Sequence, residues 1–458
     1  MAEPISLPSI QRDPAATLLE AKLRANLNDT EAWLVYADWL TAHGDPRGEL
    51  ILLARQPRQA GATKKRIAAI DRSEAWLASF VHASALVSPR WRHGFIVETS
   101  FHGLPQVEVL DALCDHPIGR LFRLTYLQAG YNEAKPPALQ ALANSAHLSS
   151  VTSLDLSHNA IGDRGVQALA SSPYLSSLTH LTLGSPAGDD DRITAAGIRA
   201  LASSPHLVSL KHLSLSRAAI GDEGVAALAG APFSLERLSL EDCGISDAGV
   251  RALADAPQLA SLKHLSLPDN PIGDLGAHAL AGSRHLASLE HLRLDSCNIG
   301  DGGLVALAHS PIIAHLKTLS LWNNRMGDEG VVALANSPHL PALTELSLGH
   351  TDVYDEGVVA LASAPRLSKL RELTLRATQV GDGAARALAD SPHMRSLVRL
   401  DLNHTHVSSS GARALLASKR LSSLKSLDLD EIQVYEEEIE ALEQQGARLQ
   451  TLYISGME

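Results

Sequence analysis

A repeated pattern of leucines constrains the fold of this chain more than any other feature. The pattern L-x-x-L-x-L begins at Leu178, Leu210, Leu235, Leu262, Leu289, Leu316, Leu343, Leu370, Leu397 and Leu424. Every step from Leu235 to Leu424 is 27 residues, and looser copies begin at Leu121, Val151 and Leu449. A period of this length predicts an array of like units, each burying its apolar face against its neighbours. The low aromatic content, 4%, suits a core built from many small leucine layers.

Each unit begins with a short alternating segment, as in Leu265-Ser266-Leu267, which predicts a strand with one buried face. Three residues after the last leucine stands a small side chain that forms hydrogen bonds. We expect this side chain to turn the chain inward. It is Asn159, Cys243, Asn270, Cys297, Asn324, Thr351, Thr378 or Thr405.

The second half of each unit predicts a helix, as in GDEGVVALANSPHL at 327–340. Asp328 is expected to cap the amino end of its own helix. Pro338 is expected to end that helix, because proline lacks an N–H group and disfavours helical geometry before it. Strand, turn and helix at this period predict a parallel sheet on a concave face and helices on a convex face.

The combined motif LxxLxLxx(N/C/T)x(I/V)GDxGxxALAxSPxL resembles the ribonuclease-inhibitor-like subfamily of leucine-rich repeats, over residues 118–458. The expected fold class is α/β, a leucine-rich-repeat solenoid with a small helical N-terminal domain. The resemblance implies a binding surface, and the fold fixes no particular chemistry. Some members of this subfamily activate GTPases, which leaves a regulatory role on a partner enzyme as the alternative.

The amino-terminal part differs in composition from the array. We predict a flexible segment at 1–14, a helical domain at 15–90, a capping strand and helix at 91–117, and repeats at 118–458. The segments LVYADWL at 34–40 and HGDPRGE at 43–49 resemble a short bacterial domain that accompanies repeat arrays. That resemblance implies no activity. The acidic segment 435–443 is expected to be the polar cap of the last unit, with a docking face as the less favoured interpretation.

Side chains that flank the strand leucines are expected to form columns on the concave face. Trp322 belongs to one column and is the only tryptophan of the array. Aromatic and arginine side chains dominate the energetics of protein interfaces, so this position is the preferred binding patch. Its other predicted members are Arg293, Asn323, Arg325, Glu345 and Arg376. The alternative is an isolated tryptophan packed on its neighbours.

Other clusters favour structural interpretations. His264 and His291 are expected to approach each other on neighbouring strands, but no carboxylate or thiolate completes a closed metal site. The same applies to His180 with His212. Asp189–Asp191 lies in the one enlarged unit, where a solvated acidic loop is favoured over a cation site, because the spacing of a calcium loop is absent.

Signatures of catalysis and of cofactors are absent from the sequence. There is no G-x-x-x-x-G-K-[ST], no G-x-G-x-x-G after a strand, no H-E-x-x-H and no G-x-S-x-G. Cys114, Cys243 and Cys297 form no C-x-x-C pair, and structural use is favoured over nucleophilic use. We therefore predict a non-enzymatic protein without a cofactor or a bound metal.

The net charge and the amino-terminal sequence limit the kinds of partner and the cellular location that are expected. The formal net charge is −12, which argues against a general binder of nucleic-acid backbones. The first residues lack the features of a secretory signal, and no segment is apolar enough to span a bilayer. The prediction is a cytoplasmic protein that binds another protein through its concave face. The partner's identity and the oligomeric state stay open.

Overall fold

The computed structural model describes residues 13–53, 80, 84, 86–92, 95–101, 107–116, 126–128, 136–184, 192–447 and 449–456. The chain forms two compact units, one of residues 1–182 with 205–207, and one of residues 183–204 with 208–458. The predicted flexible segment 1–14 lies almost wholly outside the described residues, and so does the acidic loop Asp189–Asp191.

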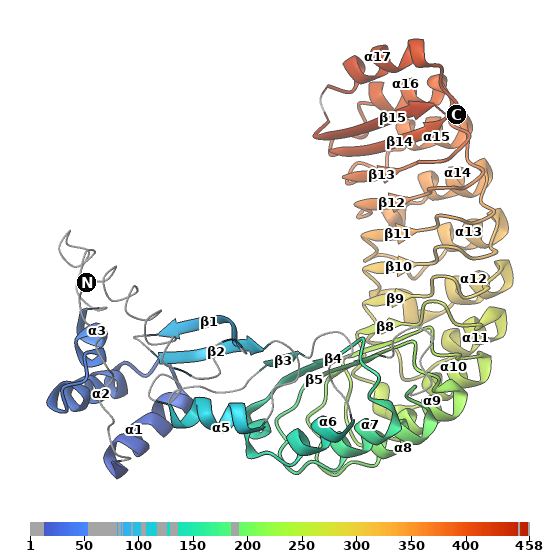
Figure 1. The fold of residues 1–458 in the computed structure, drawn as a ribbon. Helices are drawn as coiled ribbons and strands as arrows, with labels where there is room; N and C mark the ends of the chain where they lie inside the picture. Colours follow the sequence, from blue (N-terminus) through green and yellow to red (C-terminus); the bar gives the residue numbers. More distant parts are fainter. Residues whose placement is uncertain are drawn as a thin grey trace. The chain divides into compact units, whose positions relative to one another are not determined.

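The first unit begins with helices and continues into strand-and-helix repeats (Figure 1). Its elements are α1 Pro14–Ala25, α2 Thr30–Ala42, α3 Arg47–Leu53, β1 Leu86–Arg92, β2 Phe95–Phe101, α5 Val107–Asp115, β3 Tyr126–Gln128, α6 Pro136–Ala143, η3 Ala146–Ser150, β4 Ser153–Leu156 and α7 Gly162–Ala170. The strand expected near 92–100 is β2, which pairs antiparallel with β1 in a sheet of their own. β3 and β4 pair in parallel. Strand β5, His180–Gly184, lies where the two units divide.

The helices α1 to α3 enclose a small core that explains the HGDPRGE motif. Asp45 and Arg47 are fully buried and form an ion pair, and the Arg47 guanidinium lies 4.2 Å from the ring centre of Phe95. A Cβ on Gly48 would lie 2.3 Å from the Thr41 Oγ1 atom, so only glycine allows α3 to approach α2 this closely. These motif residues are therefore structural.

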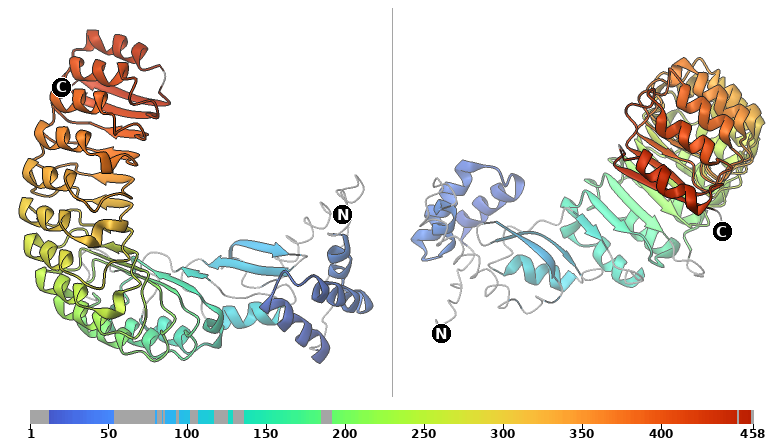
Figure 2. Two further views of the ribbon diagram at one scale, coloured as in Figure 1. Left: turned by 180° about the vertical axis from the view of Figure 1, so that it is seen from behind. Right: turned by 90° about the horizontal axis from the view of Figure 1, so that it is seen from above.

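The second unit holds the regular repeats. Its elements are α8 Ala195–Ala202, β6 His212–Ser216, α9 Gly221–Ala229, β7 Arg237–Glu241, α10 Asp247–Ala254, η4 Pro257–Leu259, β8 His264–Ser266, α11 Gly273–Ala281, β9 His291–Arg293, α12 Asp301–Ala308, η5 Pro311–His315, β10 Thr318–Ser320, α13 Asp328–Ala335, β11 Glu345–Ser347, α14 Asp355–Ser363, η6 Pro365–Leu367, β12 Glu372–Thr374, α15 Asp382–Asp390, β13 Arg399–Asp401, α16 Ser409–Ala417, β14 Ser426–Ile432, α17 Glu436–Gln445 and β15 Thr451–Gly456. Within this unit the strands line the inner, concave side and the helices lie outside them (Figures 1 and 2).

Strands β6 to β15 pair in parallel, each with the next along the chain. The register aligns equivalent positions, so that Leu292 pairs with Leu319 and Leu319 with Leu346. These leucines are buried, and the residues beside them form the expected columns on the open face of the sheet. The leucine-rich-repeat solenoid predicted from the period is confirmed.

The turn after each strand is held by the small polar side chains that the sequence singles out. Asn324 is buried, and its Nδ2 group donates to the carbonyls of Leu294, Leu321 and Trp322. Its Oδ1 atom accepts from the N–H groups of Cys297 and Ile299 in the preceding unit. Asn270 makes the equivalent five bonds two units earlier in the array. Where threonine replaces asparagine, its hydroxyl donates to the leucine carbonyl three residues before.

The aspartate of the Gly-Asp motif does not cap its own helix, and the expectation for Asp328 is wrong. Asp328 is the first residue of α13, and its Oδ1 atom accepts from the N–H groups of Tyr354 and Gly357 at the start of α14. Asp301 accepts in the same way from Gly327 and Gly330. Each carboxylate therefore satisfies free N–H groups of the next helix, whose amino end favours negative charge. The resulting aspartate ladder joins α11 to α16 through Asp274, Asp301, Asp328, Asp355 and Asp382.

Within the described ranges, every helix is too short or too polar to cross a bilayer.

Candidate functional site

Trp322 lies two residues after the end of strand β10, on the open face of the sheet. Its side chain is 37% exposed. A Cβ on Gly349, the equivalent residue of the next unit, would lie 2.9 Å from Cδ1 of the indole. Glycine at 349 therefore leaves the room that the indole occupies. The His350 ring meets the indole edge-on, with 4.7 Å between ring centres.

A solvent-open hollow of about 330 Å³ lies beside Trp322, on the side of the preceding units. Its lining combines one aromatic residue, small hydroxyl side chains, three carboxylates and one guanidinium. The lining residues are Glu241, Pro268, Asp269, Arg293, Asp295, Ser296, Ser320, Trp322 and Ser347.

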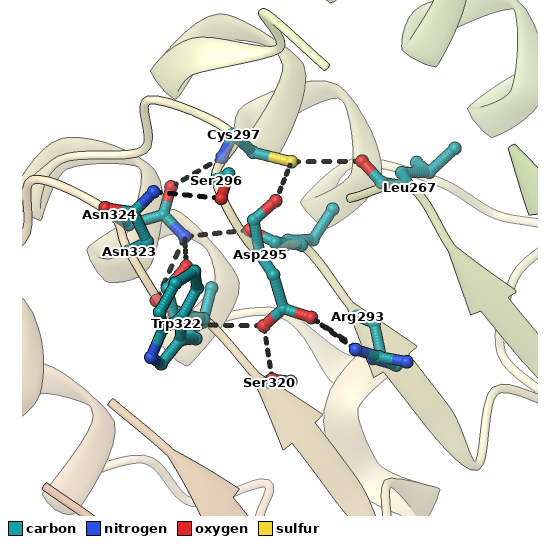
Figure 3. A network of polar contacts seen from close by, with 11 residues as sticks. Leu267, Arg293, Asp295, Ser296, Cys297, Ser320, Trp322, Asn323 and Asn324 are labelled. Carbon is teal, nitrogen blue, oxygen red and sulfur yellow. Dashed lines mark hydrogen bonds and ion pairs between the residues drawn. The ribbon is translucent and has the colours of Figure 1, made fainter. Parts of the chain in front are cut away.

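Asp295 organises the centre of this hollow (Figure 3). It is 6% exposed, and its Oδ1 atom accepts from the Ser320 hydroxyl and, at 3.1 Å, from the Trp322 N–H. Its Oδ2 atom accepts from Arg293 Nε at 3.1 Å and lies 3.0 Å from Nη2. A buried carboxylate with this many donors is fixed in place, and it fixes the guanidinium and the backbone of Trp322 with it.

The structure brings some of the predicted patch residues together and leaves others apart. Arg293 and Trp322 line the same hollow, and Asn323 donates from Nδ2 to the Ser296 hydroxyl at its rim. Glu345 accepts instead from Thr318 in the first column of the sheet. Arg325 is exposed in the turn that leads to α13, and Arg376 follows Gly349 in the column of Trp322. Neither of these arginines lines the hollow, and the patch as a binding site stays a prediction.

Sequence reasoning missed Glu241, Asp269 and Asp295 as members of the site. Glu241 and Asp295 occupy the column of Trp322, so the column itself contained the signal. Asp269 has φ of 56°, at the turn position after the strand where Ser296 and Asn323 also have positive φ. Asparagine and aspartate tolerate this left-handed conformation better than most residues.

His264 and His291 do approach each other, as their neighbouring strands predict. Their rings stack with centres 4.1 Å apart and planes 4° from parallel, and His291 Nδ1 lies 3.0 Å from the Thr318 hydroxyl. Partial burial, followed by the charges of His291 and Arg237, lowers the pKa of His264 to about 4. Burial also lowers the pKa of His291, against the opposing charges of Glu290 and Glu345. Both imidazoles are therefore neutral at pH 7.

We expect the stacked pair to make folding stability depend on pH. The folded pKa of His264 lies below its ordinary value of 6.5, so between pH 6.5 and about 4 the unfolded chain binds a proton that the folded chain does not. Stability falls as the pH falls through this window. His264→Gln should reduce the slope, which urea titrations at several pH values measure. A variant with an unchanged slope would contradict the assignment, and His393→Gln, outside the pair, is the control.

The cysteines occupy two kinds of environment. Cys243 and Cys297 are buried, and burial raises the pKa of each thiol to about 12. The Cys297 thiol contacts the backbone carbonyl of Leu267 (Figure 3), and the Cys243 thiol contacts that of Leu215. Cys114 on α5 is partly exposed, and its Sγ atom lies 3.9 Å from Nδ1 of His147. Nε2 of this histidine lies 2.8 Å from Oδ1 of Asp111.

We therefore expect the native protein to expose one reactive thiol. Iodoacetamide at pH 8 should label Cys114 and leave Cys243 and Cys297 unlabelled, because a thiolate is the reactive species. Peptide mass spectrometry measures the labelled fraction at each site, and labelling in urea gives the reference for complete modification. Equal labelling of all three cysteines without urea would show that the array opens readily.

Among the residues that the structure describes, no group of three or more His, Cys, Asp or Glu side chains is arranged to hold a metal ion.

Two protein-family models match parts of the repeat array. A leucine-rich-repeat model matches residues 147–170, 206–229 and 393–416. A model described as the PRAME C-terminal domain matches residues 223–360, which include every residue that lines the hollow. No curated protein matches the sequence.

Solved structures with similarity include an internalin from Listeria monocytogenes, at 20% identity and a TM-score of 0.46, with 73% of this chain and 87% of that chain covered. Rad7 in the Rad7–Elc1 complex of yeast has 17% identity, a TM-score of 0.45, and coverage of 85% and 87%. The structure of a TLR13–ssRNA13 complex has 20% identity, a TM-score of 0.43, and coverage of 75% and 48%.

Proposed function

We propose that this chain, a leucine-rich-repeat protein by its fold and its family matches, is a non-enzymatic module that binds a protein partner through the concave sheet around Trp322. The observation that carries the proposal is the exposed indole beside an open hollow of about 330 Å³. Interfaces concentrate their binding energy in aromatic and arginine side chains surrounded by polar groups.

The rigidity of the surface supports this proposal. Asp295 holds Arg293 and the backbone of Trp322 by hydrogen bonds, and Gly349 sets the space for the indole. Side chains fixed before binding lose less conformational freedom when a partner arrives, which favours affinity. The other proposed contacts, Asn323, Arg325, Glu345 and Arg376, extend the patch around this centre.

The test compares Trp322→Ala with the native chain in quantitative affinity capture from lysate of the source cells. Leu275→Ala is the matched control, because Leu275 is an exposed large apolar residue on helix α11, away from the sheet. We expect to find a protein that the native chain and the control both capture. The captured amount of this protein should fall about tenfold or more with Trp322→Ala.

Circular dichroism and thermal unfolding confirm that each variant is folded before capture. If Trp322→Ala retains the same proteins in the same amounts as the native chain, the proposed site is wrong. A direct titration of the purified partner with each variant then gives the change in Kd.

We further propose the ribonuclease-inhibitor-like subtype for residues 118–458 and a repeat-companion domain for residues 15–90, on the motifs quoted above. A cytoplasmic location is part of the proposal. It is supported by three free thiols, which a reducing compartment maintains. The acidic net charge favours a protein over a nucleic acid as the partner.

A further inference from the structure

The charges in the hollow beside Trp322 do not balance. Asp295 is neutralised by Arg293, which lies 3.0 Å away. Glu241 and Asp269 also line the hollow, and neither takes part in an ion pair with any residue of the described chain. Two carboxylates therefore remain without a cation at the edge of a surface that already carries a fixed guanidinium.

The indole adds an independent preference for a cation. Trp322 forms part of the wall of this hollow and is 37% exposed. The face of an indole carries partial negative charge, and tryptophan is the aromatic residue that attracts cations best. Carboxylates and indole together favour one class of ligand, a cation with a flat, delocalised charge, which stacks on an aromatic face and binds carboxylates through fixed donors.

The size and openness of the hollow indicate whether such a cation is a free small molecule or a side chain of a polypeptide. A volume of about 330 Å³ lies at the lower end for small-molecule sites. The hollow is open to solvent and continues into the columns of the sheet, where serines such as Ser320 and Ser347 offer hydroxyl groups. A side chain carried on an extended polypeptide fits this surface better than a small ligand that must be enclosed.

We propose that the hollow lined by Trp322, Glu241 and Asp269 is a subsite for an arginine side chain of the partner protein. The guanidinium lies against the indole, and the two carboxylates without an ion pair, which line the same hollow, attract its charge. Arg293 is already paired with Asp295, so it does not form an ion pair with a carboxylate of the partner. This inference rests on the proposed function and specifies the chemistry that the same surface recognises.

The experiment uses the full chain and a display library of random linear peptides. Peptides that bind the native chain and lose binding to Trp322→Ala are sequenced, and we expect arginine to be enriched at one position. One such peptide is then synthesised with arginine and with citrulline, its neutral isostere. We expect the citrulline peptide, and the variant Glu241→Gln/Asp269→Asn, each to weaken binding by about tenfold.

The matched control is Glu329→Gln/Glu356→Gln, which removes the same charge from exposed positions on helices α13 and α14. It should bind the arginine peptide as the native chain does. If it weakens binding as much as the hollow variant, the effect is general charge attraction and the subsite is wrong.

The outcomes separate the two proposals. Peptides that need Trp322 but bind equally with citrulline overturn the arginine subsite and leave the proposed function standing. A library that gives no peptide dependent on Trp322 overturns both. Light scattering at the working concentration measures whether the chain self-associates. If a second copy of the chain occupies the hollow, the proposal that an arginine of another protein does so is wrong.

Discussion

Asn324→Ala is expected to lower the free energy of unfolding by about 3–5 kcal/mol, because each buried polar group left without a partner costs about 1–3 kcal/mol. The substitution removes the acceptor of the Cys297 and Ile299 N–H groups and the donor to three carbonyls. Urea unfolding followed by circular dichroism measures the loss. Hydrogen exchange locates it, since the amides of Cys297 and Ile299 should exchange faster than those of distant units.

Two further variants make this result specific. Asn336→Ala removes an exposed asparagine after helix α13 and should change stability by about 0.5 kcal/mol or less. Asn324→Thr should fall between the two, because Thr351 stands at the equivalent position and bonds only to its own turn. If Asn324→Ala and Asn336→Ala unfold at the same urea concentration, the asparagine bonds do not stabilise the array.

Gly303→Ala is the second large effect that we expect, and two opposing terms decide its sign. Alanine in a helix is favoured over glycine by about 1 kcal/mol. At position 303, however, a Cβ would lie 2.7 Å from Asp274 Oδ1, 2.8 Å from Ile299 Cγ2 and 3.0 Å from the Ala277 Cβ. Overpacking of this kind costs about 1–3 kcal/mol, and displacing the Asp274 carboxylate also weakens its bond to the Gly300 N–H. We therefore expect a net loss of about 2 kcal/mol.

Gly282→Ala is the matched control for Gly303→Ala. A Cβ there meets its nearest heavy atom, the His278 carbonyl oxygen, at the ordinary distance of 3.5 Å, and its φ of −81° suits any residue. Thermal unfolding should show Gly282→Ala as stable as the native chain or slightly more so. A Gly303→Ala variant that is also more stable would show that the helices separate easily.

The sequence predicts the strands and their register because both depend on local periodicity. Leu319 and its equivalents are buried at every step, and the residues beside them form the columns that place Trp322 on the open face. The role of Asp328 escaped prediction, because its partners Tyr354 and Gly357 are in the next unit and a local helix pattern contains no information about that contact.

The hollow could be predicted only in part. The columns group Glu241, Asp295 and Trp322, but its depth depends on neighbouring small side chains such as Ser320 and Ser347. The pairing of Asp295 with Arg293 depends on side-chain direction, which spacing along the chain does not determine. The antiparallel hairpin of β1 and β2 was also missed, because proline within Leu86–Arg92 obscures the strand pattern.

The aspartate ladder gives the array a direction. Each helix from α12 to α16 has at its amino end a carboxylate from the unit before it. The aspartate contacts therefore all run from one unit to the next along the chain. Peeling a unit away from the carboxyl end uncovers an aspartate, which water hydrates readily. Peeling one away from the amino end uncovers N–H groups and the positive end of a helix dipole while the rest of that helix stays packed. Between Thr351 and Thr405, all of which the structure describes, the turn side chain bonds within its own unit and no asparagine reaches back to the unit before, so unravelling there is easier from the carboxyl end than from the amino end.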